Sequence, residues 1–332
     1  MVVVRVARVS AQTPAGPAST GPARPTDPAA APPAATRAQA RQQPPGLPDG
    51  TDETHLVLAL SCPDRAGIVR AVSGLLADHG GNITESQQYG DSASGRFFMR
   101  VQVETTAPRA TLEAALGELA AELDMWWQLD VAGRPMRTVL MVSREGHCLA
   151  DLLFRHQSQG LPIDPVAVVG NHSDLASIAE FYGVPFHHVP VTKETKAQAE
   201  ARLLEIFRSL DAELLVLARY MQVLSDDLCR ELGGNAINIH HSFLPSFKGA
   251  RPYAQAHSRG VKLIGATAHY VTADLDEGPI IEQDVERVAH GDDVPRLVAI
   301  GQDVERQVLA RAVRWHAEHR VLVDGQRTVV FR

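Results

Sequence analysis

The stretch AINIHHSFLPSFKGARPY (236–253) decides the fold and the search for a site. It begins as an apolar strand, in which alternate side chains lie on opposite faces. Asn238 and His240 therefore share one face, while Ile237 and Ile239 point into a packed layer. An amide donor beside an imidazole suits attack on a carbonyl, because the amide stabilises an oxyanion and the imidazole exchanges protons near neutral pH. The alternative is that Asn238 only caps the strand and His240 is a buried, hydrogen-bonded ring.

Strands and helices alternate on both sides of this stretch. The pattern predicts three earlier strands, at 137–143, 165–170 and 213–219, and two later strands near Leu263 and Ile280. It also predicts a long final helix at 294–317. Alternation of this kind is typical of a parallel sheet covered by helices. We therefore predict an α/β domain over 134–332 with a Rossmann-like, mostly parallel sheet, whose ligand sites lie at the carboxyl ends of its strands. Neither Gly-x-Gly-x-x-Gly nor GxxxxGK[ST] occurs, which argues against dinucleotide and P-loop sites.

A second polar motif follows in GATAHYVTADLDEGPIIEQ (265–283). Asp276 lies in a predicted turn before Gly278, after a strand that carries His269. A carboxylate in this place can hold an imidazole in the required tautomer or position a water. The alternative is that Asp276 is only a turn residue.

The region before residue 134 has a different order of elements. Its patterns predict strand, helix, strand, strand, helix and strand, with strands at 55–61, 82–90, 97–103 and 125–131. This order is the ferredoxin-like βαββαβ sandwich, which we place at 53–133, with a linker at Gly133 to Pro135.

Residues 1–52 are rich in Ala and Pro. Such a segment cannot bury enough apolar surface to offset its ordering entropy, so we predict a disordered tail without chemistry. Its first apolar residues are interrupted by Arg5 and Arg8, which disfavours a secretory signal.

The composition limits the classes of function. A net charge of -7 disfavours a nucleic-acid partner. No apolar run approaches the roughly 20 residues that cross a membrane. The three cysteines lie far apart without a CxxC pair, which fits a reducing compartment, and we predict a cytoplasmic protein.

The two polar motifs together resemble those of the folate-dependent formyltransferases, whose signature is Asn-Ile-His followed later by Leu-Asp-x-Gly-Pro. The resemblance extends to LVLARYMQVLS (215–225), which looks like the family's pterin-binding segment. It implies that Asn238, His240 and Asp276 are catalytic.

The same resemblance implies the substrate contacts. A formylated folate is then the substrate, and no cofactor or metal is expected. The implied pterin contacts are the backbone around Met221, Gln222, Val223 and Leu224. Two residues of the second motif, His269 and Thr272, complete the implied substrate-binding set.

The sequence LSCPDRAGIVRAVSGLLADHGGNITESQQY (60–89) resembles an ACT regulatory domain. That resemblance implies an amino-acid effector at a site comprising Asp64, Gly67, Ile68, Asn82 and Ile83. The alternative is that the domain only pairs subunits through its sheet, and we expect a homo-oligomer.

Three features indicate the hydrolytic branch of the family. His241 stands where the transferases usually have Pro, the stretch 142–156 lacks their phosphate-binding loop, and an ACT-like domain precedes the catalytic one. Water would then replace the amine, and 10-formyltetrahydrofolate would give formate for purine biosynthesis and tetrahydrofolate. The rivals are a transferase to an amine acceptor and a silent folate or amino-acid sensor.

Other chemistry has weaker support. Adjacent histidines on a strand point to opposite faces, so we do not expect His240 and His241 to ligate one metal. No activating arrangement is visible around Cys148, which we predict to be a packed or pocket-lining thiol. A Gly-x-Ser-x-Gly elbow is absent from the sequence.

Overall fold

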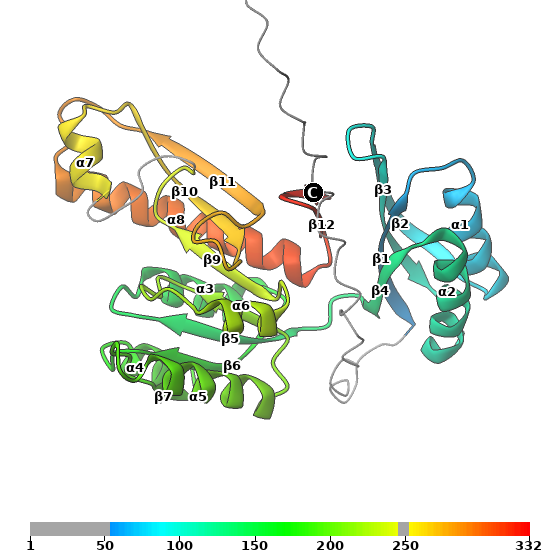
Figure 1. Ribbon diagram of the computed structural model, residues 1–332, viewed down its shortest axis with the longest axis horizontal. Coiled ribbons are helices and arrows are strands. Elements are labelled where there is room, and N and C mark those ends of the chain that lie inside the picture. Colours follow the sequence, from blue (N-terminus) through cyan, green and yellow to red (C-terminus); the bar gives the residue numbers. More distant parts are fainter. Residues whose placement is uncertain (1–53, 245–251) are drawn as a thin grey trace, which may run out of the picture. The chain divides into compact units, whose positions relative to one another are not determined.

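A computed structural model describes residues 54–244 and 252–332, so the tail predicted at 1–52 lies outside the described residues. The N-terminal module is a four-stranded antiparallel sheet of order β2-β3-β1-β4 with two helices (Figure 1). This arrangement confirms the predicted ferredoxin-like class. The elements are β1 (His55–Pro63), α1 (Ile68–Asp78), β2 (Asn82–Asp91), β3 (Arg96–Glu104), α2 (Arg109–Leu123) and β4 (Trp126–Val131).

Strand β1 is apolar along almost its whole length because both of its faces are covered. Leu58 and alternate residues pack with the two helices, in a cluster that includes Val72 and Leu116. Ala59, on the opposite face, packs instead with Phe98 and Phe331. A strand buried on both sides has no polar alternation, which explains the continuous apolar run.

The C-terminal module has a seven-stranded sheet of order β11-β10-β9-β8-β5-β6-β7, in which β10 alone runs antiparallel to the other described strands. The mostly parallel prediction is therefore confirmed. The sequence reading missed β7, whose three residues are too few for a periodic pattern. The strands are β5 (Met136–Val142), β6 (Ile163–Gly170), β7 (Phe186–His188), β8 (Leu214–Leu217), β9 (Ala236–His240), β10 (Leu263–Tyr270) and β11 (Ile280–Arg287).

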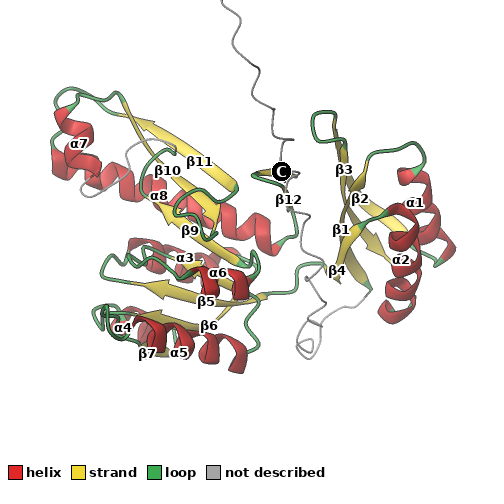
Figure 2. Ribbon diagram, in the orientation of Figure 1, coloured by secondary structure: helices red, strands yellow, loops and turns green. Residues whose placement is uncertain are grey.

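Helices cover both faces of this sheet (Figure 2). One face packs against α3 (His147–Gln159), α4 (Ala176–Phe181) and α8 (Val294–Ala317). The other packs against α5 (Lys196–Ser209) and α6 (Asp226–Leu232). The described part is completed by α7 (Pro252–Ser258) and by a hairpin of β12 (Val321–Asp324) and β13 (Arg327–Val330), which the sequence reading did not predict. Within the described ranges, no helix is both long and apolar enough to cross a membrane.

Buried charges join the two modules. Arg134 donates to Asp130 at 2.7 Å and to Glu213 of the second module at 2.6 Å. Arg100, only 1% exposed, donates from Nε to the Glu318 carbonyl at 3.0 Å. Burial raises the pKa of Asp130, but hydrogen bonds and charges from His319 and Arg134 lower it more, and the pKa lies well below its usual range.

Candidate active site

Strands β5, β8 and β9 end at one edge of the large sheet, where open α/β sheets bind ligands. The last residue of β9 is His240, and Asn238 lies two residues earlier. Between them, Ile239 packs into the core together with Ile237. The predicted alternation along this strand is therefore confirmed, and both polar side chains lie on the face away from that core.

The register between β9 and β10 places Asn238 directly opposite His269. Asn238 Nδ2 lies 3.2 Å from His269 Nε2, and His269 Nδ1 lies 2.9 Å from the Tyr270 carbonyl oxygen. Because a carbonyl can only accept, His269 donates from Nδ1 to Tyr270, and its Nε2 faces both the amide of Asn238 and the carboxylate of Asp276. The amide nitrogen of Asn238 is thereby held in one orientation and keeps a second N–H for a ligand.

The turn between β10 and β11 brings Asp276 to the same place. Asp276 has φ 57°, a left-handed conformation that Asp tolerates better than most residues. Two residues on, a Cβ at Gly278 would lie 1.8 Å from the Tyr270 carbonyl oxygen, so only glycine lets the turn fold over the end of β10. Thr272 supports the turn by donating its hydroxyl to the Asp274 carbonyl at 3.0 Å.

His240 is oriented by Asp276. The distance from His240 Nδ1 to Asp276 Oδ2 is 3.3 Å, and His269 Nε2 lies 3.7 Å from the other carboxylate oxygen. Burial raises the pKa of Asp276, but hydrogen bonds and charges from the two histidines lower it more, so the pKa falls far below its usual range. The ionised carboxylate favours the proton on Nδ1 and leaves Nε2 as a base. That Nε2 atom is buried and has no hydrogen-bond partner among the described residues.

His241 lies directly against the His240 ring. The two rings stack with centroids 5.2 Å apart and an interplanar angle of 13°. Our expectation that they point to opposite faces is therefore wrong, because β9 ends at His240 and strand alternation does not extend to the next residue. Burial, with the nearby charges of Arg219 and His240, lowers the pKa of His241 to about 4, so this ring is neutral at pH 7.

The predicted substrate contacts differ in exposure. Met221 and Val223 follow β8 and are 54% and 53% exposed, whereas Leu224 packs in the core, so that only its backbone can contact a ligand. The Met221 amide donates to Ser143 Oγ at 3.0 Å, which ties this segment to the end of β5. His269 is 2% exposed, with both ring nitrogens in contact with protein atoms. We therefore interpret His269 as a residue that positions Asn238.

Within one chain, the predicted effector residues do not come together. Asp64 follows Pro63, which pairs with Arg96, at one end of the small sheet. Asn82 pairs with Glu104 at the other end of β3. Ile83 lies beside Asn82, while Gly67 begins α1 and Ile68 is buried in the core.

A second buried polar group, which the sequence reading missed, lies around Glu305. Glu305 is fully buried; its Oε2 accepts from His147 Nε2 at 2.7 Å and its Oε1 from the Tyr253 hydroxyl at 2.6 Å. Arg219 Nε lies 3.5 Å from Oε2. The available signal was an acidic residue on the apolar face of the last helix, four positions before Leu309.

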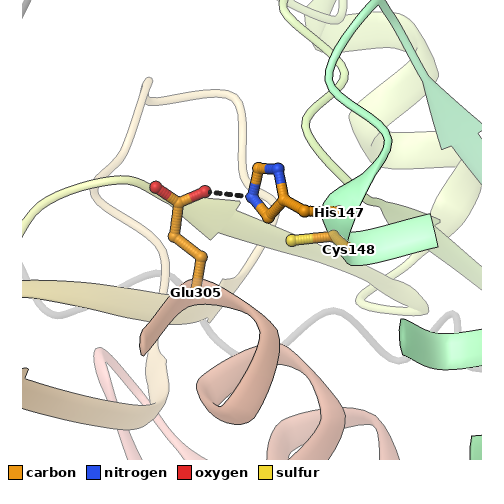
Figure 3. A group of neighbouring side chains, drawn as sticks. All are labelled: His147, Cys148 and Glu305. Atoms are coloured by element: carbon orange, nitrogen blue, oxygen red, sulfur yellow. Dashed lines mark hydrogen bonds and ion pairs between the residues drawn. The ribbon is translucent and has the colours of Figure 1, made fainter. Parts of the chain in front are cut away.

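Three atoms of this group could hold a metal ion. Figure 3 shows His147 and Cys148, at the start of α3, beside Glu305 of α8, and their donor atoms lie within 4.8 Å of one another. Three features disfavour a cation: the His147–Glu305 hydrogen bond occupies both partners, the Arg219 charge is adjacent, and burial raises the pKa of the Cys148 thiol well above its usual value. Cys148 packs in the hydrophobic core, as a structural thiol does.

Comparison with known proteins places the chain in a family. Residues 136–313 match the formyl transferase family model, and residues 56–121 match the ACT domain model. The chain is 53% identical to the formyltetrahydrofolate deformylase of Corynebacterium sp. (strain P-1), over 85% of this chain and the whole relative, and 47% identical to that of Bacillus subtilis, over 85% and 95%. The solved formyltetrahydrofolate deformylase of Burkholderia mallei superposes with a TM-score of 0.81 at 51% identity, covering 84% of this chain and all of that one. Sequence, fold and domain order therefore show that the chain belongs to the formyltetrahydrofolate deformylase family.

Proposed function

We propose that this protein hydrolyses 10-formyltetrahydrofolate to formate and tetrahydrofolate. The observation that carries the proposal is the grouping of Asp276, His240 and Asn238 at the carboxyl ends of the strands. His240 Nε2 is buried without a hydrogen-bond partner among the described residues, while its other nitrogen is held by a carboxylate. An imidazole in this state can take a proton from water.

The mechanism needs three groups from the chain. His240 removes a proton from a water as its oxygen bonds to the formyl carbon, and Asp276 stabilises the imidazolium that forms. The remaining N–H of Asn238 donates to the oxyanion of the tetrahedral intermediate. When that intermediate collapses, the C–N bond breaks, His240 returns the proton to the folate nitrogen, and formate leaves. Water is the only co-reactant, so the reaction requires no cofactor.

The cellular setting is a further part of the proposal. Formate released here would supply purine biosynthesis and balance the one-carbon folate pool, in the cytoplasm. All three cysteines, Cys62, Cys148 and Cys229, are buried and unpaired, which supports a reducing compartment.

Regulation is assigned to the ACT domain, with an amino acid as effector and a homo-oligomer as the assembly. Strand β2 supports the assembly, because it is ten residues long and lies at the edge of the small sheet, where an unpaired strand can add to a second copy. Light scattering of the purified protein tests this part, and a monomer at all concentrations would contradict it.

The activity is tested with 10-formyltetrahydrofolate as the sole added substrate, following formate and tetrahydrofolate together. We expect equal release of both, and loss of both in Asp276→Ala. Asp274→Ala is the matched control, because Asp274 is an exposed acidic residue of the same turn. Release only after an amine is added would show a transferase, and no turnover with or without amines would support a sensor.

A further inference from the structure

Arg219 is a largely buried cation, and two of its three donor nitrogens have no acceptor among the described residues. Its guanidinium side chain is 13% exposed, and both Nε and Nη1 are buried without a hydrogen-bond partner among the described residues. An unsatisfied buried donor is unfavourable, because it has lost its hydrogen bond to water without gaining one in the protein. Arg219 also has φ 66°, in the left-handed region that non-glycine residues rarely occupy. Two unfavourable features at one residue, next to a candidate active site, point to a ligand.

Glu305 neutralises this cation without satisfying its donors. Its two oxygens already accept from His147 and Tyr253, at 2.7 and 2.6 Å. The remaining contact, 3.5 Å from Arg219 Nε to Oε2, is an ion pair without hydrogen-bond geometry. Burial raises the pKa of Glu305, but its three partners lower it more, so the carboxylate stays ionised. The N–H groups of Arg219 therefore remain available to acceptor oxygens from outside the cluster.

The group is held rigidly and adjoins the catalytic imidazole. A Cβ at Gly301 would lie 2.0 Å from the Tyr253 hydroxyl oxygen, so α8 has room for this tyrosine only because Gly301 has no side chain. The Tyr253 ring faces the His241 ring with centroids 6.4 Å apart, and His241 stacks on His240. Figure 3 shows Glu305 and His147 reaching toward each other from α8 and the start of α3.

We propose that Arg219 forms a subsite for a small carboxylate, and that formate occupies it after hydrolysis. This inference rests on the proposed function, because hydrolysis at His240 produces formate beside the cluster. A guanidinium binds a carboxylate through parallel, charge-assisted hydrogen bonds. Formate supplies two acceptor oxygens and a negative charge in the smallest carboxylate.

The subsite has a kinetic consequence. Formate on Arg219 is a product still bound near the reacting centre, so added formate inhibits turnover and the inhibition depends on the guanidinium. Propionate carries the same carboxylate on a longer chain, and we expect it to inhibit less. Chloride, which offers no paired oxygens, is the reference anion.

The test is direct binding of ¹³C-formate to the full-length protein without folate, followed by NMR line broadening at constant ionic strength. In Arg219→Asn we expect binding at least about ten-fold weaker, because a hydrogen bond to a charged group contributes about 1.5–3 kcal/mol. Asn accepts the left-handed backbone, so this variant should fold. Arg202→Gln removes a cation from an exposed position and should bind formate like the wild type.

A second variant separates a binding role from a structural one. Glu305→Gln removes the negative charge beside Arg219 while keeping an acceptor oxygen, so we expect formate to bind at least as tightly as in the wild type. If the cluster is only structural, Arg219→Asn and Glu305→Gln lose melting temperature alike and formate binding changes in neither. Unchanged formate binding in a folded Arg219→Asn protein overturns the subsite.

The subsite and the proposed function fail separately. A protein that releases formate from the folate, yet binds formate equally well without Arg219, has the activity but not the subsite. A protein that binds ¹³C-formate through Arg219 but releases none from the folate has the subsite and lacks the activity.

Discussion

Two turns of this chain were predicted to bind ligands, and they differ in how their side chains are held. The turn that carries Asp276 is fixed at both ends, through contacts with His240 and His269 and through the close approach of Gly278 to β10. The turn that carries Asp64 is exposed, and the Asp64 backbone N–H donates to the Gly95 carbonyl at 2.8 Å.

The first turn is held rigidly, as the proposed catalysis requires, and the second is exposed, as a proposed effector site can be. Catalysis requires donors fixed before the charge develops, and each contact of Asp276 and Asn238 contributes to that. An effector turn can be ordered by the ligand that it binds. Substitutions in the first turn should therefore change turnover strongly, while substitutions in the second should change only the response to an added ligand.

After Asp276→Ala, the largest effect should come from Asn238→Ala. Loss of an oxyanion donor typically lowers kcat about 100- to 1,000-fold, and KM should change little because the contact strengthens only in the transition state. Steady-state kinetics with 10-formyltetrahydrofolate measure both constants. Turnover within a few-fold of the wild type would remove Asn238 from the reaction.

His269→Gln tests whether Asn238 needs a rigid support. Gln can accept one hydrogen bond but cannot reproduce the geometry that joins Asn238, Tyr270 and Asp276, so we expect kcat to fall about 10- to 100-fold at nearly constant KM. His257→Gln, at an exposed position, is the control. A rise in KM with unchanged kcat would instead show that His269 contacts the substrate.

Much of this arrangement followed from the sequence, because strand alternation and the turn before Gly278 are local patterns. Asn238, His240 and Asp276 were predicted from two short motifs, and the structure brings all three together. The cluster around Glu305 could not be predicted in the same way. Its members come from α3, the end of β8, α7 and α8, and no local pattern reports a contact across 158 residues, as between His147 and Glu305.

A third prediction concerns the strand end that supports the catalytic turn. The Tyr270 hydroxyl lies 2.8 Å from His316 Nδ1, within hydrogen-bond distance, and burial, with the nearby charge of His319, lowers the pKa of His316 from 6.5 to about 3. Below pH 6.5 the unfolded chain binds a proton at this residue and the folded chain does not, so stability falls as pH drops toward 3. Between pH 6.5 and 5 the loss should be about 1–2 kcal/mol.

Urea denaturation at pH 7 and pH 5 measures that loss. His316→Gln keeps an acceptor for Tyr270 and removes the titrating ring, so its stability should depend less on pH. His290→Gln, at an exposed position, should keep the wild-type dependence. Equal dependence in His316→Gln and the wild type would contradict the lowered pKa of His316.

The smallest effect is expected at the exposed turn of the ACT domain. Asp64→Ala removes an exposed carboxylate, so basal turnover should stay within about two-fold of the wild type, because surface substitutions usually change stability by less than about 0.5 kcal/mol. If an amino acid binds here, it should raise the melting temperature of the wild type and change its turnover, and Asp64→Ala should weaken both responses together. Asp78→Ala, on an exposed part of α1, is the matched control.

A screen of the common amino acids in which none changes either quantity would leave subunit pairing as the role of this domain. A response that Asp64→Ala leaves intact would place the effector elsewhere, and the contrast between the two turns would then concern only the rigidity of the catalytic one.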